Sequence, residues 1–150
     1  MTADNGSGEL QDLDVLVGRW TMTASFNSGG TPPLAETTFE WLEGRTFLVQ
    51  RWRVDHPDAP DGIAIIGYDA ERATLLQHYF DSRGVVRVYD MSLAGNTWQL
   101  MRIGQDFSQR FIGVFDESRD VITGSWEASS DDGATWEHDF DLTYTKASDD

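Results

Sequence analysis

The feature that most constrains this chain is a regular succession of short alternating segments between Trp20 and Lys146. In each segment apolar and polar residues alternate, and a few residues rich in Gly, Asp, Asn or Ser separate it from the next. Period-two alternation is typical of strands that bury one face, and nothing in this part of the chain has the pattern of a long helix. Many short strands at even spacing predict an antiparallel sheet that closes on itself or forms a sandwich.

Closure into a barrel is the simpler prediction, because the connections between the predicted strands are nearly all of hairpin length. Strands joined by short connections pair with their neighbours in sequence, and closing the meander removes the exposed edges of a large open sheet. We therefore predict an all-β fold, a closed antiparallel up-and-down barrel of about ten strands. The predicted strands span residues 18–27, 36–43, 46–55, 62–69, 74–81, 84–93, 97–103, 107–116, 121–128 and 135–146.

A short amphipathic segment, residues 9–17, precedes the strands. Leu10, Leu13, Leu16 and Val17 fall on one face of a helix or turn. A helix this short needs a surface to cover, and the open end of a barrel is the natural one. Because 150 residues fit one domain with its own core, we expect a single domain over 9–147, a disordered tail over 1–8 and an acidic tail over 148–150.

The charge balance and the absence of cysteine exclude several classes of function. The net charge is −15, from 26 acidic and 11 basic residues, so we expect no binding to nucleic acid or to anionic membranes. The lack of cysteine excludes disulfides, thiolate metal sites and cysteine nucleophiles. The polar N-terminus lacks the apolar core of a signal peptide, and no run is long enough to span a membrane. We therefore expect a soluble, cytoplasmic protein, with a homodimer as an open alternative to a monomer.

The last predicted strand has the clearest alternation. One face carries Glu137, Asp139, Asp141 and Thr143 and must face water, so the other face must point inward. The inward set then contains a single polar, titratable side chain, His138. The inward set consists of Trp136, His138, Phe140, Leu142 and Tyr144.

The other strands differ in how clearly they divide into two faces. Gln109 and Phe111 are predicted to point inward from strand 107–116, and Trp126 from strand 121–128. In strand 46–55 the face that carries Trp52 is favoured for the interior, which leaves Arg51 outside. The pattern does not decide which face of 74–81 or of 84–93 points inward.

A turn motif precedes the last strand. Residues 129–136, Ser-Ser-Asp-Asp-Gly-Ala-Thr-Trp, match an Asp-box pattern, Ser-x-Asp-x-Gly-x-Thr-Trp. The carboxylate of Asp131 can accept hydrogen bonds from loop amides, and Gly133 can supply a positive φ. The motif therefore predicts a hairpin and favours a structural role over a catalytic one.

The start of the first strand resembles that of the calycin barrels, which include lipocalins, fatty-acid-binding proteins and nitrobindins. The residues that carry the resemblance are Gly18-Arg19-Trp20, just after the short helix. In those families the Trp packs across one end of the barrel. From Leu10 to Lys146 the chain also resembles an uncharacterised bacterial family of such barrels, which starts Leu-x-Gly-x-Trp and ends Ser-x-Asp-Gly-x-Thr-Trp before a final strand. This resemblance implies a fold and no established reaction.

Two functional interpretations of His138 stand beside a structural one. The resemblance to nitrobindins implies that a last-strand His could ligate haem, but the glycine-rich segment that those proteins carry after the first Trp is replaced here by residues 21–27, Thr-Met-Thr-Ala-Ser-Phe-Asn. An interior imidazole could also move a proton. The structural interpretation, which we favour, is a buried His hydrogen-bonded to a neighbour such as Tyr144 or Gln109.

A second resemblance involves Arg87-Val88-Tyr89, which is similar to the Arg-x-Tyr pair that binds a carboxylate in fatty-acid-binding proteins. The family's pair lies on the final strand and this one lies mid-chain. An Arg inside an apolar barrel is costly unless an anion pairs with it, so a surface position is the favoured interpretation of Arg87.

The function we predict is binding of a small hydrophobic or amphipathic molecule inside the barrel. The first alternative is a small cyclase or isomerase with His138 or Tyr144 as the candidate catalytic residue, and the second is haem binding through His138. We predict no other cofactor and no metal site, because the spacing of the histidines forms none. The predicted ligand-binding residues are Trp20, Met22, Trp41, Trp52, Tyr89, Gln109, Phe111, Trp126, His138, Phe140 and Tyr144.

Overall fold

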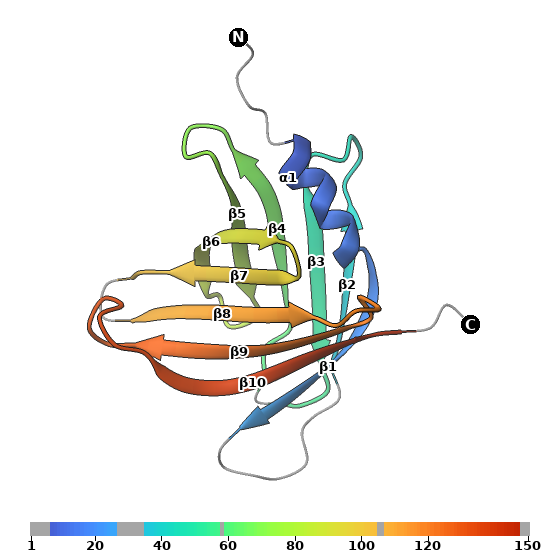
Figure 1. Cartoon of the computed structure of the whole chain (residues 1–150). Coiled ribbons are helices and arrows are strands. Elements are labelled where there is room, and N and C mark those ends of the chain that lie inside the picture. The colour runs from blue at the N-terminus through green and yellow to red at the C-terminus, as the bar shows by residue number, and fades with distance from the viewer. Residues whose placement is uncertain (1–6, 27–34, 58, 105–106, 148–150) are drawn as a thin grey trace.

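The computed structural model of the chain is a closed barrel of ten antiparallel strands with a short helix at its N-terminal end (Figure 1). It describes residues 7–26, 35–57, 59–104 and 107–147. The predicted fold class and the up-and-down order are therefore confirmed. The elements are α1 Ser7–Asp12, the 3₁₀ turn η1 Leu13–Leu16, β1 Gly18–Phe26, β2 Ala35–Trp41, β3 Leu48–Val54, β4 Gly62–Asp69, β5 Thr74–Asp81, β6 Val86–Ala94, β7 Thr97–Arg102, β8 Ser108–Phe115, β9 Val121–Ser129 and β10 Glu137–Lys146.

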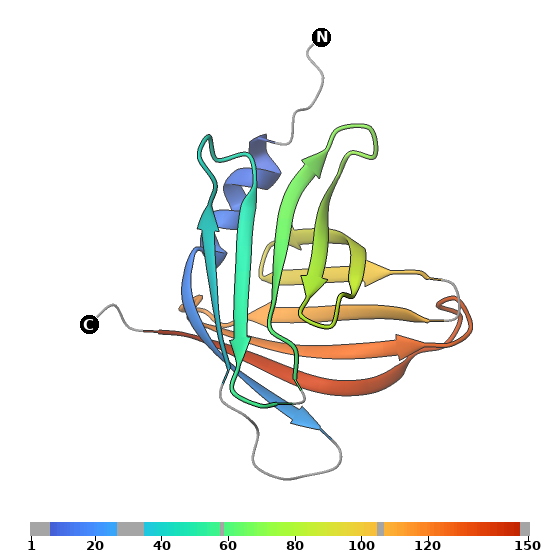
Figure 2. The same ribbon diagram turned by 180° about the vertical axis from the view of Figure 1, so that it is seen from behind.

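Every strand pairs with its neighbours in sequence, and β1 closes the barrel by pairing with both β2 and β10. The closing pair runs from Trp20 opposite Lys146 to Phe26 opposite Phe140. Figure 2 shows the same closure from behind, with β3–β5 running steeply across β7–β10. Closure satisfies both edges of the meander, which explains why so many short strands form one stable sheet.

The N-terminal segment closes one end of the barrel, as the amphipathic pattern predicts. Leu13 and Leu16 are fully buried in the core. Trp20 donates its indole N–H to the carbonyl of Leu16 over 2.8 Å, and Trp41 donates to the Asp14 carboxylate over 2.7 Å. These contacts anchor η1 across the barrel end, where neither a helix of this length nor an open barrel would be stable alone.

A β-bulge in β10 changes which residues face inward. Glu137 lies opposite Ala128 and His138 opposite Glu127, but Phe140 lies opposite Trp126, so the register shifts between His138 and Phe140. An extra residue on one strand reverses the alternation on one side of it. The prediction that His138 faces the interior is therefore wrong, whereas the inward placement of Phe140, Leu142 and Tyr144 is confirmed.

The predicted tails fall mostly outside the described residues. This holds for residues 148–150 and for all of 1–8 except Ser7 and Gly8, which begin α1. Among the described residues, no helix is both long and apolar enough to cross a membrane.

Candidate functional site

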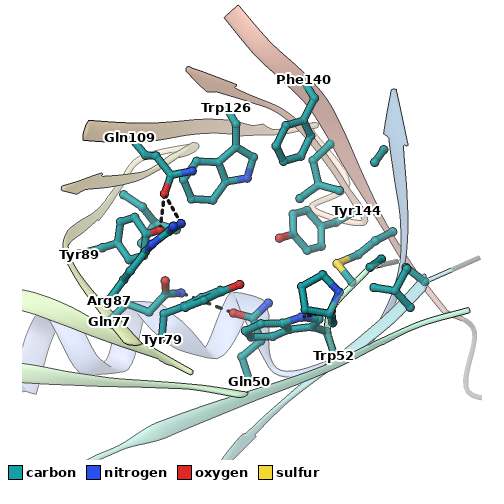
Figure 3. Close-up of a pocket in the computed structure, with 18 of the residues that line it drawn as sticks. Gln50, Trp52, Gln77, Tyr79, Arg87, Tyr89, Gln109, Trp126, Phe140 and Tyr144 are labelled. Atoms are coloured by element: carbon teal, nitrogen blue, oxygen red, sulfur yellow. Dashed lines mark hydrogen bonds between the residues drawn. The ribbon is translucent and has the colours of Figure 1, made fainter. Parts of the chain in front are cut away.

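A cavity of about 430 Å³ lies inside the barrel (Figure 3). It is bounded by the ends of β1, β3 and β5 and by the connections that follow β3 and β5, so it lies toward the end opposite η1. Ligand pockets in proteins commonly have volumes from about 300 to 1,000 Å³ and mostly apolar walls. The lining residues are Met22, Ala24, Ala35, Gln50, Trp52, Val54, Ala59, Pro60, Gln77, Tyr79, Arg83, Arg87, Tyr89, Trp98, Leu100, Gln109, Trp126, Phe140, Leu142 and Tyr144.

Aromatic rings in mutual contact form an arc around the cavity. Trp52 and Tyr79 are stacked, with centroids 5.2 Å apart, and Trp126 and Phe140 are stacked at 6.4 Å. Tyr89 joins the two pairs, because it meets both Tyr79 and Trp126 edge to face. Contacts of this kind hold each ring in a fixed orientation, so the wall has a preformed shape.

A second group of rings packs behind this arc. Phe111 lies 5.0 Å from Trp98 and 5.2 Å from Trp126, measured between centroids. Gly113 and Gly124, paired across β8 and β9, leave the space for the Phe111 ring. A Cβ at Gly124 would lie 2.4 Å from that ring, which is shorter than any real contact.

Buried glutamines give the cavity a polar strip. Gln50 donates to the hydroxyl of Thr37 over 3.2 Å, and that hydroxyl donates to the Arg51 carbonyl over 2.9 Å. The side-chain amide of Gln77 donates to the side-chain oxygen of Gln50 over 3.5 Å. This chain of hydrogen bonds fixes the orientation of both side-chain amides.

Arg87, Tyr89 and Gln109 form a second polar group. The side-chain oxygen of Gln109 accepts a hydrogen bond from Arg87 over 2.9 Å and another from the Tyr89 hydroxyl over 2.8 Å (Figure 3). The guanidinium also lies over the ring of Phe107, 5.5 Å from its centroid. Among the described residues Arg87 has no salt bridge. The prediction of a surface position for Arg87 is therefore wrong, because this half-buried side chain lines the cavity.

Asp81 connects the wall to the β5–β6 turn. Its buried carboxylate accepts hydrogen bonds from the Tyr79 hydroxyl over 2.6 Å and from the Arg83 guanidinium over 2.7 Å. The bonds from Arg83, and then that from Tyr79, hold the pKa of Asp81 well below its usual range despite burial. Burial, together with the bond to Asp81, raises the pKa of Tyr79 above its usual range.

The other two tyrosines of the cavity are also held in the protonated form. Burial raises the pKa of Tyr144 above its usual range, although the nearby Gln50 amide opposes the change. Burial likewise raises the pKa of Tyr89, against the effect of Arg87. At neutral pH the Tyr144 hydroxyl keeps its proton as a hydrogen-bond donor and the Tyr89 proton is already donated to Gln109, so neither group is poised to act as a base.

The structure brings together seven of the eleven predicted ligand-binding residues. Phe111 lies behind the wall, in contact with Trp126, and Trp20 and Trp41 bind the N-terminal segment at the other end of the barrel. The prediction that these three side chains line the cavity is therefore wrong, because the two tryptophans pack against η1 and Phe111 packs behind the lining rings. The seven that line it are Met22, Trp52, Tyr89, Gln109, Trp126, Phe140 and Tyr144.

His138, the fourth of the misplaced residues, lies on the outer surface. Its side chain is 45% exposed, and Nε2 lies 2.8 Å from the Asp141 carboxylate. Ser125 donates its hydroxyl proton to the same carboxylate oxygen. These residues are therefore not a nucleophilic triad, because the serine donates to the acid rather than to the imidazole. No group of three or more His, Asp or Glu in the described part of the chain is arranged to hold a metal ion.

Sequence reasoning missed several residues of the site, above all Gln77, Tyr79, Arg83 and Arg87. Gln77 and Tyr79 belong to β5 and Arg87 to β6, the two strands whose inward face the pattern left undecided. One signal for Arg87 was available in the sequence. Tyr89 was predicted to line the cavity, and Arg87, two residues before it on the same strand, must then point inward as well. Side chains at i and i+2 of a strand always share a face.

The Asp-box turn has the structural role that its sequence predicts. The Asp131 carboxylate accepts hydrogen bonds from the Ser129 hydroxyl and from the amide and hydroxyl of Thr135. These bonds lower the pKa of Asp131 to about 2. Gly133 has a φ of 88°, in the region that favours glycine.

Comparison with known protein families and with curated proteins finds no match for this chain.

Proposed function

We propose that this chain binds a small amphipathic molecule inside its barrel. The apolar part of the ligand would lie among the aromatic rings, and a hydrogen-bond acceptor of the ligand would meet Arg87 and Gln109. Apolar walls with a few fixed polar groups are the usual composition of a small-molecule site.

The observation that carries the proposal is the position of Arg87. A guanidinium partly removed from water in an apolar cavity is costly unless a partner of opposite charge compensates it. Its partners among the described side chains are the neutral Gln109 oxygen and the ring of Phe107. A ligand acceptor would supply the missing compensation.

The ionisable side chains in and around the cavity favour ligand binding over proton transfer as its function. The tyrosines of the cavity stay protonated, and the Asp81 carboxylate is occupied by Tyr79 and Arg83. All three histidines are described, and all are exposed. The haem and histidine-enzyme alternatives required an inward imidazole, so the residues present do not fit them.

The proposal is tested by filling the cavity. Ala24 lines it and the next residue, Ser25, faces outward and is exposed, so Ala24→Trp and Ser25→Trp form a matched pair. Fluorescence titration with 1-anilinonaphthalene-8-sulfonate should give saturable binding that Ala24→Trp weakens by about tenfold and Ser25→Trp leaves unchanged. Circular dichroism would check that both variants keep the fold. Equal binding by wild type and a folded Ala24→Trp would overturn the proposal.

A further inference from the structure

We infer that the ligand of this cavity is a planar aromatic anion, with its ring on Tyr79 and its charged group at Arg87. This inference rests on the proposed function and names the chemical class of the ligand. It is carried by the rigidity of one ring pair, by the arrangement of a second pair across the cavity, and by the local balance of charge.

The first ring pair is a fixed flat surface. Trp52 is held by a hydrogen bond from its indole N–H to the Pro60 carbonyl over 3.2 Å, and Tyr79 by its bond to Asp81. Gly62 leaves room for the indole, since a Cβ there would lie 2.1 Å from Trp52. In Figure 3 Tyr79 lies over Trp52 and is the ring nearer to the open space. Stacking on Trp52 covers one face of Tyr79, so we place the ring of the ligand against the side of Tyr79 that borders the open space.

The second ring pair lies across the cavity from the first. Trp126 and Phe140 are nearly parallel, at 24°, and Figure 3 shows them on the opposite wall. Tyr89 lies between the two pairs, at 77° to Tyr79 and 66° to Trp126. The space between them therefore has a preset width and shape. A flat, rigid ligand loses little conformational entropy there and gains ring contacts, whereas an alkyl chain must lose its rotamer freedom and gains only burial.

The charged residues that line the cavity are both basic, although the chain as a whole is acidic. The chain carries −15, yet two of its 11 basic residues, Arg83 and Arg87, line the cavity. The Asp81 carboxylate neutralises Arg83 over 2.7 Å, whereas no carboxylate of the residues that the structure describes forms a salt bridge with Arg87. A third cation, Arg102, is half-buried on β7, donates to the Phe107 carbonyl, and acts on Tyr89 electrostatically.

The anionic group of the ligand could be a carboxylate, a sulfonate or a phosphate, because each offers oxygens that accept hydrogen bonds from Arg87. Arg87 can donate to any of their oxygens, and charge-assisted bonds of this type are stronger than neutral ones. Because the Gln109 oxygen already accepts two bonds, its amide nitrogen is the group left to donate to a second ligand oxygen. Comparing 2-naphthoate, 2-naphthalenesulfonate and 2-naphthyl phosphate would identify the preferred group.

The test compares three small probes by calorimetry on the full chain. 2-Naphthoate is flat and anionic, 2-naphthamide is flat and neutral, and decanoate is anionic and flexible at a similar size. We expect 2-naphthoate to bind at least about tenfold more tightly than either of the others. This comparison uses wild-type protein, so it decides the inference without any variant.

Variants then assign each preference to a residue. Arg87→Met should reduce the naphthoate-over-naphthamide preference to within about twofold, and Arg51→Met, on the outer face, should leave it unchanged. Tyr79→Leu should remove the naphthoate-over-decanoate preference, and Tyr79→Phe, which keeps the ring, should retain it. Circular dichroism would confirm that each variant is folded.

The outcomes separate the inference from the proposed function. If decanoate binds as well as 2-naphthoate, planarity is overturned, and if 2-naphthamide does, the anionic group is overturned. If none of the three binds while the neutral dye N-phenyl-1-naphthylamine still enters the cavity, the ligand class is overturned and the proposed function stands. If that dye also fails to enter the cavity, the proposed function fails with it.

Discussion

Replacing Asp81 by Asn tests the network that holds the cavity wall in place. The carboxylate accepts hydrogen bonds from the Tyr79 hydroxyl, from the Arg83 amide over 2.9 Å and from the Arg83 guanidinium. The oxygen of an Asn can keep the bond from the Arg83 amide. Its NH₂ group, however, would face donors, so the bonds from Tyr79 and from the guanidinium lose their acceptor or its charge.

The expected cost follows from the burial of each bond. A buried hydrogen bond to a charged group contributes about 1.5–3 kcal/mol, which applies to Tyr79. The Arg83 side chain is 55% exposed, so solvent screening limits its pair to about 0–1 kcal/mol. Together these give a loss of about 1.5–4 kcal/mol in the free energy of unfolding. For a domain of this size that corresponds to a decrease in Tm of roughly 3–16 °C.

Thermal and urea denaturation followed by circular dichroism would measure this loss, with Asp90→Asn as the control. Asp90 lies on the next strand and is exposed on the outer face, so its substitution should change stability by less than about 0.5 kcal/mol. If Asp81→Asn costs no more than Asp90→Asn, the reasoning about the Asp81 network is refuted.

The stability difference should also depend on pH with a definite sign. The pKa of Asp81 is lower in the folded chain than in the unfolded chain, so the folded state favours the ionised form. Its contribution is fully present above the unfolded pKa of about 3.9 and is lost as pH falls from there toward the folded value. Wild type and Asp81→Asn should therefore differ equally at pH 7 and pH 6 and converge below about pH 4. A difference that grew as pH fell would contradict the assignment.

Two further predictions concern the wall and the outer surface. Gly124→Ala should destabilise the protein by about 1–3 kcal/mol, because its methyl group would collide with the Phe111 ring, and Gly8→Ala, with open space around it, should not; equal melting curves for the two would exclude the collision. His138→Ala should change the free energy of unfolding by less than about 0.5 kcal/mol and leave binding of 1-anilinonaphthalene-8-sulfonate unaltered, because the side chain lies on the outer face; a weakened titration would place His138 in the binding site after all.

The structure explains the Asp-box sequence near the end of the chain, but it does not test the resemblance of the chain's start to calycin barrels. The hydrogen bonds of Asp131 explain why the Ser-x-Asp-x-Gly-x-Thr-Trp pattern forms a hairpin turn. Trp20 also packs at one end of the barrel, as the resemblance implies. Membership of a calycin family remains a prediction.

The sequence by itself was sufficient to predict a closed barrel. The alternation within each strand and the short connections between strands can be read locally, and closure follows because an open sheet of ten strands would expose two edges. Alternation identified the inward faces of β1, β3, β8 and β9, and the amphipathic segment before them was correctly predicted to close one end. A local rule of this kind holds as long as the alternation is unbroken.

The tertiary structure decided where the interior is hollow and which polar residues reach it. One extra residue in β10 turned His138 outward, and nothing in the alternation of that strand marks a bulge. The faces of β5 and β6 are apolar on both sides in sequence, so only pairing with the neighbouring strands placed Tyr79 and Arg87 inside. A cavity is a property of the space between distant strands. The sequence predicted a closed barrel with an internal binding site. Only the packing showed that one end of the barrel is filled by Trp20, Leu13 and Leu16, while the other end has a cavity with Arg87 among aromatic rings.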